Sequence, residues 1–208
     1  MDPKCKICRR ANEKLFLKGD KCTSSKCPLL KKPYPPGSGP KQRKGKRLSE
    51  YGKELREAKM LKSIYKIQDK QFKKMIRSVL ERKGEEDVST LLIKVLEKQL
   101  FNVIFRAGLA KSRSQAKKLV SHGHFIFKGR KIDIPSIKIK IGDEIKIKEK
   151  SKKNKYFQQI FLTLKKENTS SWLSLDNDKK IIKVIGEPEV SEAGIKVNVP
   201  LILAFYSR

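Results

Sequence analysis

An excess of positive charge is the strongest constraint on what this chain can fold into. Among its 208 residues, 51 are Lys or Arg and 22 are Asp or Glu, which gives a formal net charge of +29 at neutral pH. Charge of one sign at this level repels itself in a compact fold unless an anionic partner neutralises it. The sequence therefore predicts a polyanionic partner, and a nucleic acid fits that description.

The positive charge is concentrated in two blocks. Residues 1–47 carry 15 Lys or Arg against 3 Asp or Glu, and residues 91–150 carry 15 against 5. The segment between them is nearly balanced. Two separate basic blocks favour contact with phosphate groups over a merely solvated face.

The first block ends in a stretch that has no means of building a core. Residues 31–47 are rich in proline, glycine and cations, a composition typical of an extended or flexible linker. We expect this linker to lie along a phosphate backbone. Its candidate RNA contacts are Lys41, Arg43, Lys44, Lys46 and Arg47.

Helical patterns dominate the first half of the chain. Ser49 is a candidate N-cap for a helix to about residue 65, and a second helix is predicted from Asp69 to a stop at Gly84. Further helices are predicted from about residue 89 and over 100–108. Ser112 is the expected N-cap of a basic helix over 113–121, with three cations on its outer face, namely Arg113, Lys117 and Lys118.

The pattern changes to strands after His122-Gly123. Residues 124–127 form a predicted strand, and Lys128-Gly129 supplies a turn. Isoleucines then alternate with lysines over 137–141 and again over 145–148, which predicts half-buried strands with a cationic outer face. A helix is expected near 157–164, and residues 201–206 are expected to dock onto helices 49–84.

All four cysteines lie within the first 27 residues, in the pattern Cys5-x2-Cys8 and Cys22-x4-Cys27. Two short-spaced thiolate pairs separated by a loop are typical of a tetrahedral Zn²⁺ site with a structural role. A metal-binding arm of this kind gains much of its folding free energy from the metal. An iron–sulfur cluster uses the same ligands and stays an alternative, as does a disulfide pair.

The sequence shows no convincing set of catalytic residues. The two histidines, His122 and His124, flank Gly123 without an evident nucleophile or carboxylate partner, so turn geometry or a contact to RNA is the simpler interpretation. There is no GxxxxGK[ST] phosphate loop and no HExxH pattern. A membrane span and a secretory signal are also not expected.

Several motifs together resemble a known family. Residues 109–116 (LAKSRSQA), followed by Leu119-Val120, His122-Gly123-His124 and Ile134-Pro135-Ser136, resemble the S4-type RNA-binding module. The cysteine spacing and four further segments are similar to bacterial-type ribosomal proteins of the S4 family, and the similarity covers nearly the whole chain. Those segments are residues 16–19, 34–37, 48–52 and 205–208.

The resemblance implies a structural protein of the small ribosomal subunit. As implied by the family, it is a primary 16S rRNA-binding protein that nucleates assembly of the 5′ domain and contributes to translational accuracy. Expected neighbours are proteins S5 and S12 and the mRNA where it enters the subunit, and the expected location is the cytoplasm or an organelle such as a plastid. The alternatives are an RNA-modifying enzyme with the same module and a zinc-dependent transcription factor.

The resemblance also implies an α+β architecture in which a small RNA-binding module is inserted into a mainly helical domain. The expected parts are a metal-stabilised arm over 1–47, a helical domain over 48–90, the RNA-binding module over 91–164, and a C-terminal segment 165–208 that completes the helical domain.

The expected RNA contacts in the module are mostly cationic. Several positions depart from the family pattern, among them Phe101, where Leu-Asp-Asn is usual, and Lys128, where Asn usually precedes the glycine. The candidate contacts are Arg106, Lys111, Ser112, Arg113, Gln115, Lys117, Lys118, His122, His124, Lys128 and Arg130.

Overall fold

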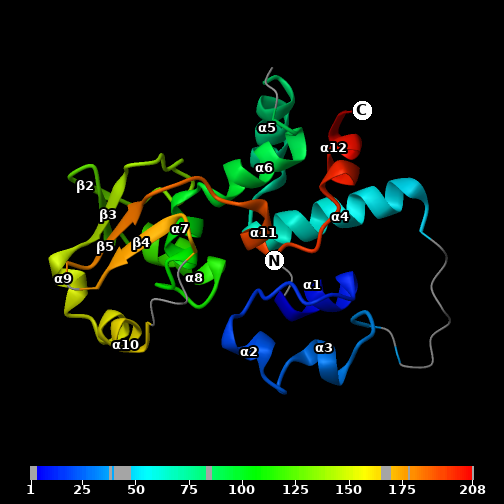
Figure 1. Cartoon of the computed structure of the whole chain (residues 1–208). Helices are drawn as coiled ribbons and strands as arrows, with labels where there is room; N and C mark the ends of the chain where they lie inside the picture. The colour runs from blue at the N-terminus through cyan, green and yellow to red at the C-terminus, as the bar shows by residue number, and fades with distance from the viewer. Residues whose placement is uncertain are drawn as a thin grey trace. The chain divides into compact units, whose positions relative to one another are not determined.

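The computed structural model describes residues 4–37, 39, 48–82, 86–164, 170–177 and 179–207. The chain divides into two compact units (Figure 1). Unit 1 joins residues 1–89 to the C-terminal residues 195–208, and unit 2 comprises residues 90–194. A discontinuous unit with an inserted second unit was the architecture that the family resemblance implied.

Unit 1 consists of helices. Their bounds are α1 (Lys4–Ala11), α2 (Asp20–Thr23), α3 (Pro28–Lys31), α4 (Glu50–Tyr65), α5 (Asp69–Leu80) and α12 (Val199–Ser207). The prediction of Ser49 as a helix cap is confirmed, since its side chain accepts a hydrogen bond from the Gly52 N–H at 3.2 Å. The stop predicted at Gly84 lies outside the described residues.

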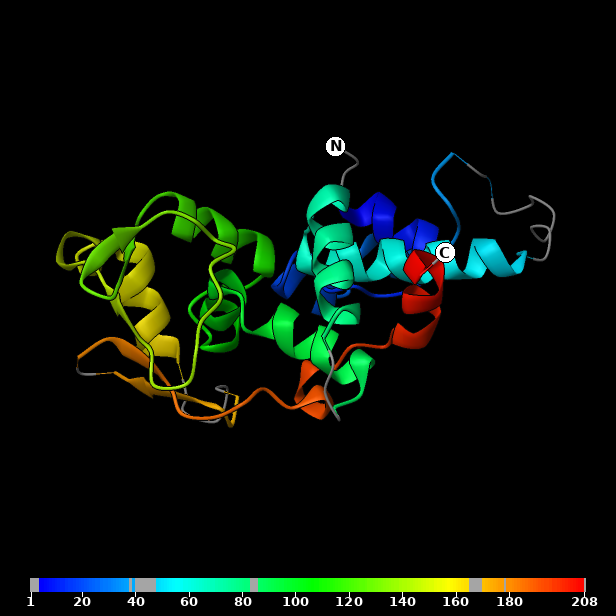
Figure 2. The same cartoon turned by 90° about the horizontal axis from the view of Figure 1, so that it is seen from above.

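The C-terminal helix α12 packs against α4 and α5, as the sequence predicted for residues 201–206 (Figures 1 and 2). Two aromatic pairs hold it there. The rings of Tyr51 and Phe205 are 5.4 Å apart between centroids, and those of Phe72 and Tyr206 are 5.5 Å apart. Aromatic pairs at these distances add to the free energy gained from burying the helix face.

The N-terminal arm also packs on α4. A small apolar cluster joins residues of α1 and the loop after it to Met60, and its buried members are Cys8, Ala11, Leu15, Leu17 and Met60. The Arg56 guanidinium donates a hydrogen bond to the Ala11 carbonyl. The arm thus has apolar contacts of its own, in addition to any stabilisation by a metal.

Unit 2 combines helices with one antiparallel sheet. The sheet has the order β2-β1-β3-β5-β4, with every neighbouring pair antiparallel. The elements in chain order are α6 (Val88–Glu97), which begins two residues before the unit, α7 (Leu100–Arg106), α8 (Arg113–Ser121), β1 (Phe125–Phe127), β2 (Arg130–Ile132), β3 (Glu144–Ile147), α9 (Glu149–Lys152), α10 (Lys155–Thr163), β4 (Leu173–Asp176), β5 (Ile181–Val184) and α11 (Val190–Ala193).

The buried face of the sheet is apolar and meets α10. Phe125, Ile145 and Ile182 share this face through the strand register and are fully or almost fully buried. The Phe157 ring of α10 lies 6.1 Å from the Phe125 ring, and α10 lies beside the strands in Figure 2. The core of unit 2 therefore lies between the sheet and its helices.

Two features of unit 2 differ from the sequence-based predictions. The segment 165–208 does not join the helical domain as a whole, because β4 and β5 pair within the sheet of unit 2 and only residues 195–208 belong to unit 1. Residues 137–141 do not form a strand. The backbone there pairs with residues 98–100 at the start of α7, where Ile137 accepts a hydrogen bond from the Leu100 N–H and Ile139 donates one to the Lys98 carbonyl.

The β1–β2 hairpin generates a stability prediction at Lys128. Both residues of its two-residue turn have positive φ, 50° at Lys128 and 76° at Gly129, and such turns favour Asn-Gly because lysine is strained there. We expect Lys128→Asn to raise the free energy of unfolding by about 1 kcal/mol. Chemical denaturation measures this free energy. Lys138→Asn is the control, because Lys138 is an exposed lysine without positive φ. Equal effects of the two substitutions would contradict the strain argument.

Candidate nucleic-acid interface

Helix α8 is held by a capping arrangement that involves two of the predicted RNA contacts. The Ser112 hydroxyl accepts a hydrogen bond from the Gln115 N–H at 3.3 Å, and the Gln115 side chain accepts one from the Lys111 N–H at 3.0 Å. Ser112 is buried. The structure therefore places Ser112 and Gln115 as caps of α8, and their predicted contact with RNA stays a prediction.

The remaining cations of α8 differ in exposure. Lys111, just before the helix, and Lys118 are exposed, whereas Lys117 is half-buried. The Lys117 ammonium lies 4.5 Å from the centre of the Phe101 ring, and Phe101 is completely buried. Lys117 thus covers an aromatic ring of α7 while its helix presents Lys118 to solvent.

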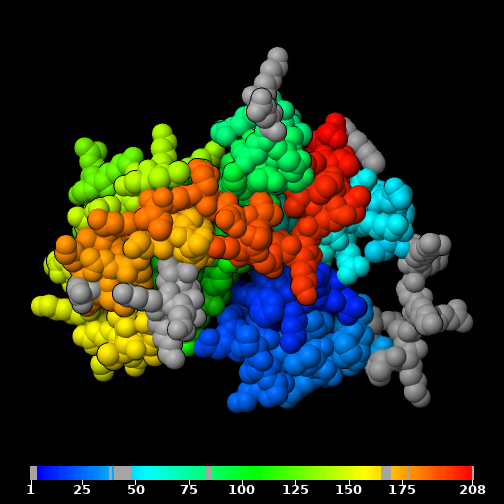
Figure 3. Space-filling model, in the orientation of Figure 1, coloured from blue at the N-terminus to red at the C-terminus, as the bar shows by residue number. Residues whose placement is uncertain are grey.

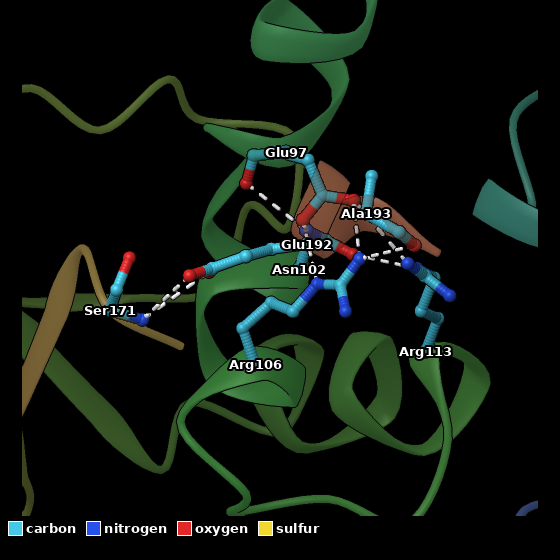
Figure 4. Close-up of polar contacts among 7 residues, drawn as sticks. All are labelled: Glu97, Asn102, Arg106, Arg113, Ser171, Glu192 and Ala193. Carbon is cyan, nitrogen blue, oxygen red and sulfur yellow. Dashed lines mark hydrogen bonds and ion pairs between the residues drawn. The ribbon is translucent and has the colours of Figure 1, made fainter. Parts of the chain in front are cut away.

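A buried carboxylate, Glu97, organises the base of α7 and α8 (Figure 4). Its side chain is 1% exposed and accepts hydrogen bonds from Arg106 Nε at 2.7 Å and from a second Arg106 nitrogen at 3.0 Å. Asn102 Nδ2 donates to the same carboxylate at 2.6 Å. Arg113 donates from Nε to Asn102 Oδ1 at 2.6 Å and lies 3.4 Å from the Glu97 carboxylate.

This network binds the guanidinium groups of Arg106 and Arg113 to a buried carboxylate, and their predicted contact with RNA stays a prediction. Their side chains are only 16% and 13% exposed, and the Arg113 guanidinium also lies over the Phe105 ring at 4.7 Å. An arginine fork satisfies a buried carboxylate with two donors in fixed geometry, which a lysine does not match. The sequence signal for this was Glu97, an acidic residue within the buried apolar run of α6.

The network continues to the end of unit 2. Arg106 donates to the Ala193 carbonyl at 2.8 Å, and the Glu192 carboxylate accepts from the Ser171 N–H at 3.2 Å (Figure 4). Lys98 pairs with Glu187 at 2.5 Å. The segment 185–193, orange to red on the visible surface in Figure 3, is therefore bound along its length to the rest of the unit.

Two further predicted contacts, Lys128 and Arg130, flank the tip of the β1–β2 hairpin. Both residues are exposed. Lys128 lies 3.5 Å from the Asp143 carboxylate, and its ammonium is 5.2 Å from the centre of the Phe127 ring. The Lys128 side chain is 65% exposed while that of Asp143 is 13% exposed, so the Lys128 charge stays accessible to an anion.

The solvent-facing side of the sheet balances its own charge. Glu144 lies between two lysines, 2.8 Å from Lys183 and 3.8 Å from Lys146. The hydrogen bond from Lys183 holds the pKa of the Glu144 carboxyl below its ordinary value. The cationic outer face predicted from the alternating lysines is therefore partly neutralised at this position.

The two histidines lie at the turn between α8 and β1. His122 is exposed, and His124 is half-buried with its Nδ1 atom 2.9 Å from the Ser151 hydroxyl. Burial lowers the pKa of His124, and the neighbouring His122 and Lys148 lower it further. The linker cations predicted to contact RNA, at positions 41, 43, 44, 46 and 47, lie outside the described residues.

The four cysteines come together in unit 1. Cys5, Cys8, Cys22 and Cys27 line one small pocket, and none forms a disulfide. The Lys18 N–H donates a hydrogen bond to Cys22 Sγ at 3.3 Å. Burial raises the pKa of the Cys8 thiol, and the other three thiols act in the same direction. Among the described residues, no three His, Cys, Asp or Glu side chains stand in an arrangement that would hold a metal ion.

Comparisons with known proteins assign most of the chain to two family models. Residues 1–97 match the model described as the ribosomal protein S4/S9 N-terminal domain, and residues 99–145 match the S4 domain. In the described part of the chain, no helix has the length and apolar character that a bilayer-crossing segment needs.

Similar proteins match this chain from end to end. The small ribosomal subunit protein uS4 of Thermus thermophilus is 38% identical over 206 residues, which is 99% of this chain and 97% of that protein. The proteins of the same name from Syntrophomonas wolfei and Kosmotoga olearia are 40% and 41% identical over 207 residues. They cover 100% and 99% of this chain and 98% and 97% of their own length.

The Glu97 network generates a stability prediction. Replacing a buried carboxylate by an amide leaves Arg106 and Arg113 without their counter-charge, so we expect Glu97→Gln to lower the free energy of unfolding by about 3–5 kcal/mol. Urea denaturation followed by the fluorescence of Trp172, the single tryptophan, reports on unit 2. Glu144→Gln is the matched control and should leave the midpoint nearly unchanged. A midpoint for Glu97→Gln equal to that of the control would contradict the role given to the network.

Proposed function

The chain belongs to the S4 family of small-subunit ribosomal proteins, and on that premise we propose that it is a primary 16S rRNA-binding protein that nucleates assembly of the 5′ domain. It is a structural component of the small subunit and not an enzyme. The observation that carries the proposal is the similarity to uS4 proteins over the full length of the chain. The net charge of +29 supplies the electrostatic attraction that binding to RNA requires.

The exposed cations of unit 2 support a binding mode based on phosphate contacts. Helix α8 and the β1–β2 hairpin present Lys111, Lys118, Lys128 and Arg130 to solvent. Side chains do not reach the bases in the deep major groove of A-form RNA, so recognition by such residues follows phosphate positions and RNA shape. Arg106 and Arg113 act indirectly in this mode by keeping α7 and α8 in place.

The proposal extends to the surroundings that the family resemblance implies. Within the small subunit the protein neighbours proteins S5 and S12 and lies close to the mRNA where it enters. Through these contacts it contributes to translational accuracy. The linker residues 41–47 supply a second set of phosphate contacts along the RNA, because five of the seven are Lys or Arg.

A structural Zn²⁺ ion is part of the proposal for unit 1. Cys5, Cys8, Cys22 and Cys27 would hold it, since four thiolates are the usual ligand set of structural zinc. Their gathering around one pocket supports this, as does the Lys18 N–H bonded to Cys22, which is the kind of hydrogen bond that orients a metal ligand. Zinc would crosslink α1 to the loops that carry the second cysteine pair. An iron–sulfur cluster remains the competing occupant.

The RNA-binding proposal predicts different effects for two cations of the same helix. Replacing the exposed Lys118 by Gln should weaken binding and reduce the slope of log affinity against log salt by about 1. Arg113→Gln removes the same charge from an internal position, so the slope should stay unchanged while unit 2 loses stability. Filter binding to transcribed 16S 5′-domain RNA across a salt series measures both effects.

A scrambled RNA of equal length is the control for this experiment. We expect a preference for the 5′-domain RNA that persists at high salt. Salt screens the non-specific phosphate contacts, whereas the specific complex keeps its additional interactions. Equal binding of both RNAs, with a steep loss in salt, would contradict specific recognition. If Arg113→Gln reduced the salt slope and Lys118→Gln left it unchanged, the RNA-binding surface would be placed wrongly.

The zinc proposal predicts the metal content of the purified protein. Elemental analysis should find about one zinc per chain, and Cys8→Ser should abolish it because three thiolates bind zinc more weakly than four. Ser25→Ala in the same arm is the matched control and should retain the metal. Bound iron with visible absorbance would show that the site holds an iron–sulfur cluster and not zinc. A folded protein without metal would overturn the proposal.

A further inference from the structure

The turn between α8 and β1 brings together cationic groups from three elements. His122 and His124 lie on the turn itself, with ring centroids 6.0 Å apart. Lys131 reaches the turn from β2, and Lys148 reaches it from the residue before α9. We name these four residues the turn cluster.

The absence of a side chain at Gly123 makes room for Lys131 against the turn. A Cβ atom at Gly123 would lie 2.1 Å from Cε of Lys131, so the lysine stem occupies the space that any other residue would fill. Gly123 also has a φ of 69°, which disfavours other residues. The backbone thus leaves room for the Lys131 side chain against the turn at Gly123.

The second side of the turn is closed by α9 and α10. The Lys148 N–H donates to the His124 carbonyl at 2.9 Å, and His124 Nδ1 lies 2.9 Å from the Ser151 hydroxyl. The Phe157 ring of α10 meets the His124 ring edge to face at 5.5 Å between centroids. His124 is therefore held in one orientation by contacts from two helices.

No acidic group balances the turn cluster among the described residues. The charged groups that act on His124 are His122 and Lys148, both basic. Glu149, the nearest acid in sequence, pairs with Lys152, and the described ion pairs do not include Lys131 or Lys148. A cationic cluster without a carboxylate is stabilised by an external anion.

We propose that the turn cluster is a binding site for an RNA phosphodiester, and that its histidines take up protons when the phosphate binds. The inference rests on the proposed RNA-binding function and adds a site and a proton linkage to it. Lys131 and Lys148 supply permanent charge, and the two histidines add charge through the protons they take up.

The direction of the linkage follows from the electrostatics. In the free protein, burial and basic neighbours hold the pKa of His124 below its ordinary value, so the ring is largely neutral near pH 7. A phosphate close to the ring favours the protonated form and raises the pKa. The complex therefore binds more protons than the free protein, and RNA affinity rises as the pH falls through the interval between the two pKa values.

The composition of the chain makes this linkage measurable. His122 and His124 are its only two histidines, and histidine is the side chain whose ordinary pKa lies between pH 5 and 8. Proton uptake on RNA binding in this range therefore reports on the turn cluster. For a histidine whose pKa rises by one unit on binding, uptake reaches about 0.5 proton midway between its free and bound pKa values.

Isothermal titration calorimetry of the full chain with 16S 5′-domain RNA tests the inference. Titrations at about pH 6.5, where histidine changes its charge, give the number of protons taken up when two buffers of different ionisation enthalpy are compared. We expect uptake of several tenths of a proton and binding several-fold tighter at about pH 6 than at about pH 8. A His122→Gln, His124→Gln double variant should lose both effects.

A matched control removes one charge elsewhere. Lys183→Gln alters an exposed lysine that pairs with Glu144 on the sheet, so it should leave proton uptake unchanged. His122→Gln alone, at the exposed histidine, keeps the test informative if the substitution at His124 perturbs folding; it should reduce uptake. Thermal unfolding of each variant establishes that it is folded.

The outcomes separate this inference from the proposed function. Specific RNA binding without proton uptake, or with uptake that persists in the double variant, would overturn the inference and leave the proposed function intact. Equal binding of 5′-domain and scrambled RNA would overturn the proposed function itself. Uptake that vanishes in the double variant and survives in Lys183→Gln would establish the turn cluster as the site.

Discussion

The buried Glu97 carboxylate is the interaction on which the architecture of unit 2 most depends. It holds Arg106 of α7 and Arg113 of α8, and through Arg106 it reaches the Ala193 carbonyl at the end of the unit. A buried charge is tolerated only when its partners satisfy it, and here Asn102 completes the set. The network thus fixes the helix that carries Lys118 relative to the segment that leads out of the unit.

This arrangement divides the basic residues into two roles. The guanidinium groups of Arg106 and Arg113 face a buried carboxylate, where their planar fork supplies several hydrogen bonds at once. Lys111 and Lys118 are exposed residues. The large positive charge of the chain is therefore only partly available to RNA, and a count of basic residues overstates the number of phosphate contacts.

Local patterns in the sequence predicted much of the fold. Ser49 and Ser112 were identified as caps because capping depends on neighbouring residues, and the Lys128-Gly129 turn follows from its own backbone preference. The pairing of β5 with β3 and the internal position of Arg113 were missed. Both depend on partners distant in sequence, Ile145 opposite Ile182 and Glu97 opposite Arg113, which no local pattern specifies. The strand predicted from the alternating isoleucines at 137–141 is wrong, because their backbone pairs with residues 98–100 at the start of α7.

We propose that Arg106 and Arg113 support the RNA-binding surface from within, while Lys118 and the other exposed cations form it. Residue-specific chemical modification with mass spectrometry, on the free protein and its complex with 16S 5′-domain RNA, tests this most directly. We expect Arg106 and Arg113 to resist an arginine-specific dicarbonyl in both states, whereas Lys118 should react in the free protein and be protected by RNA. An Arg113 that reacts in the free protein and becomes protected in the complex would contradict the supporting role given to the arginines.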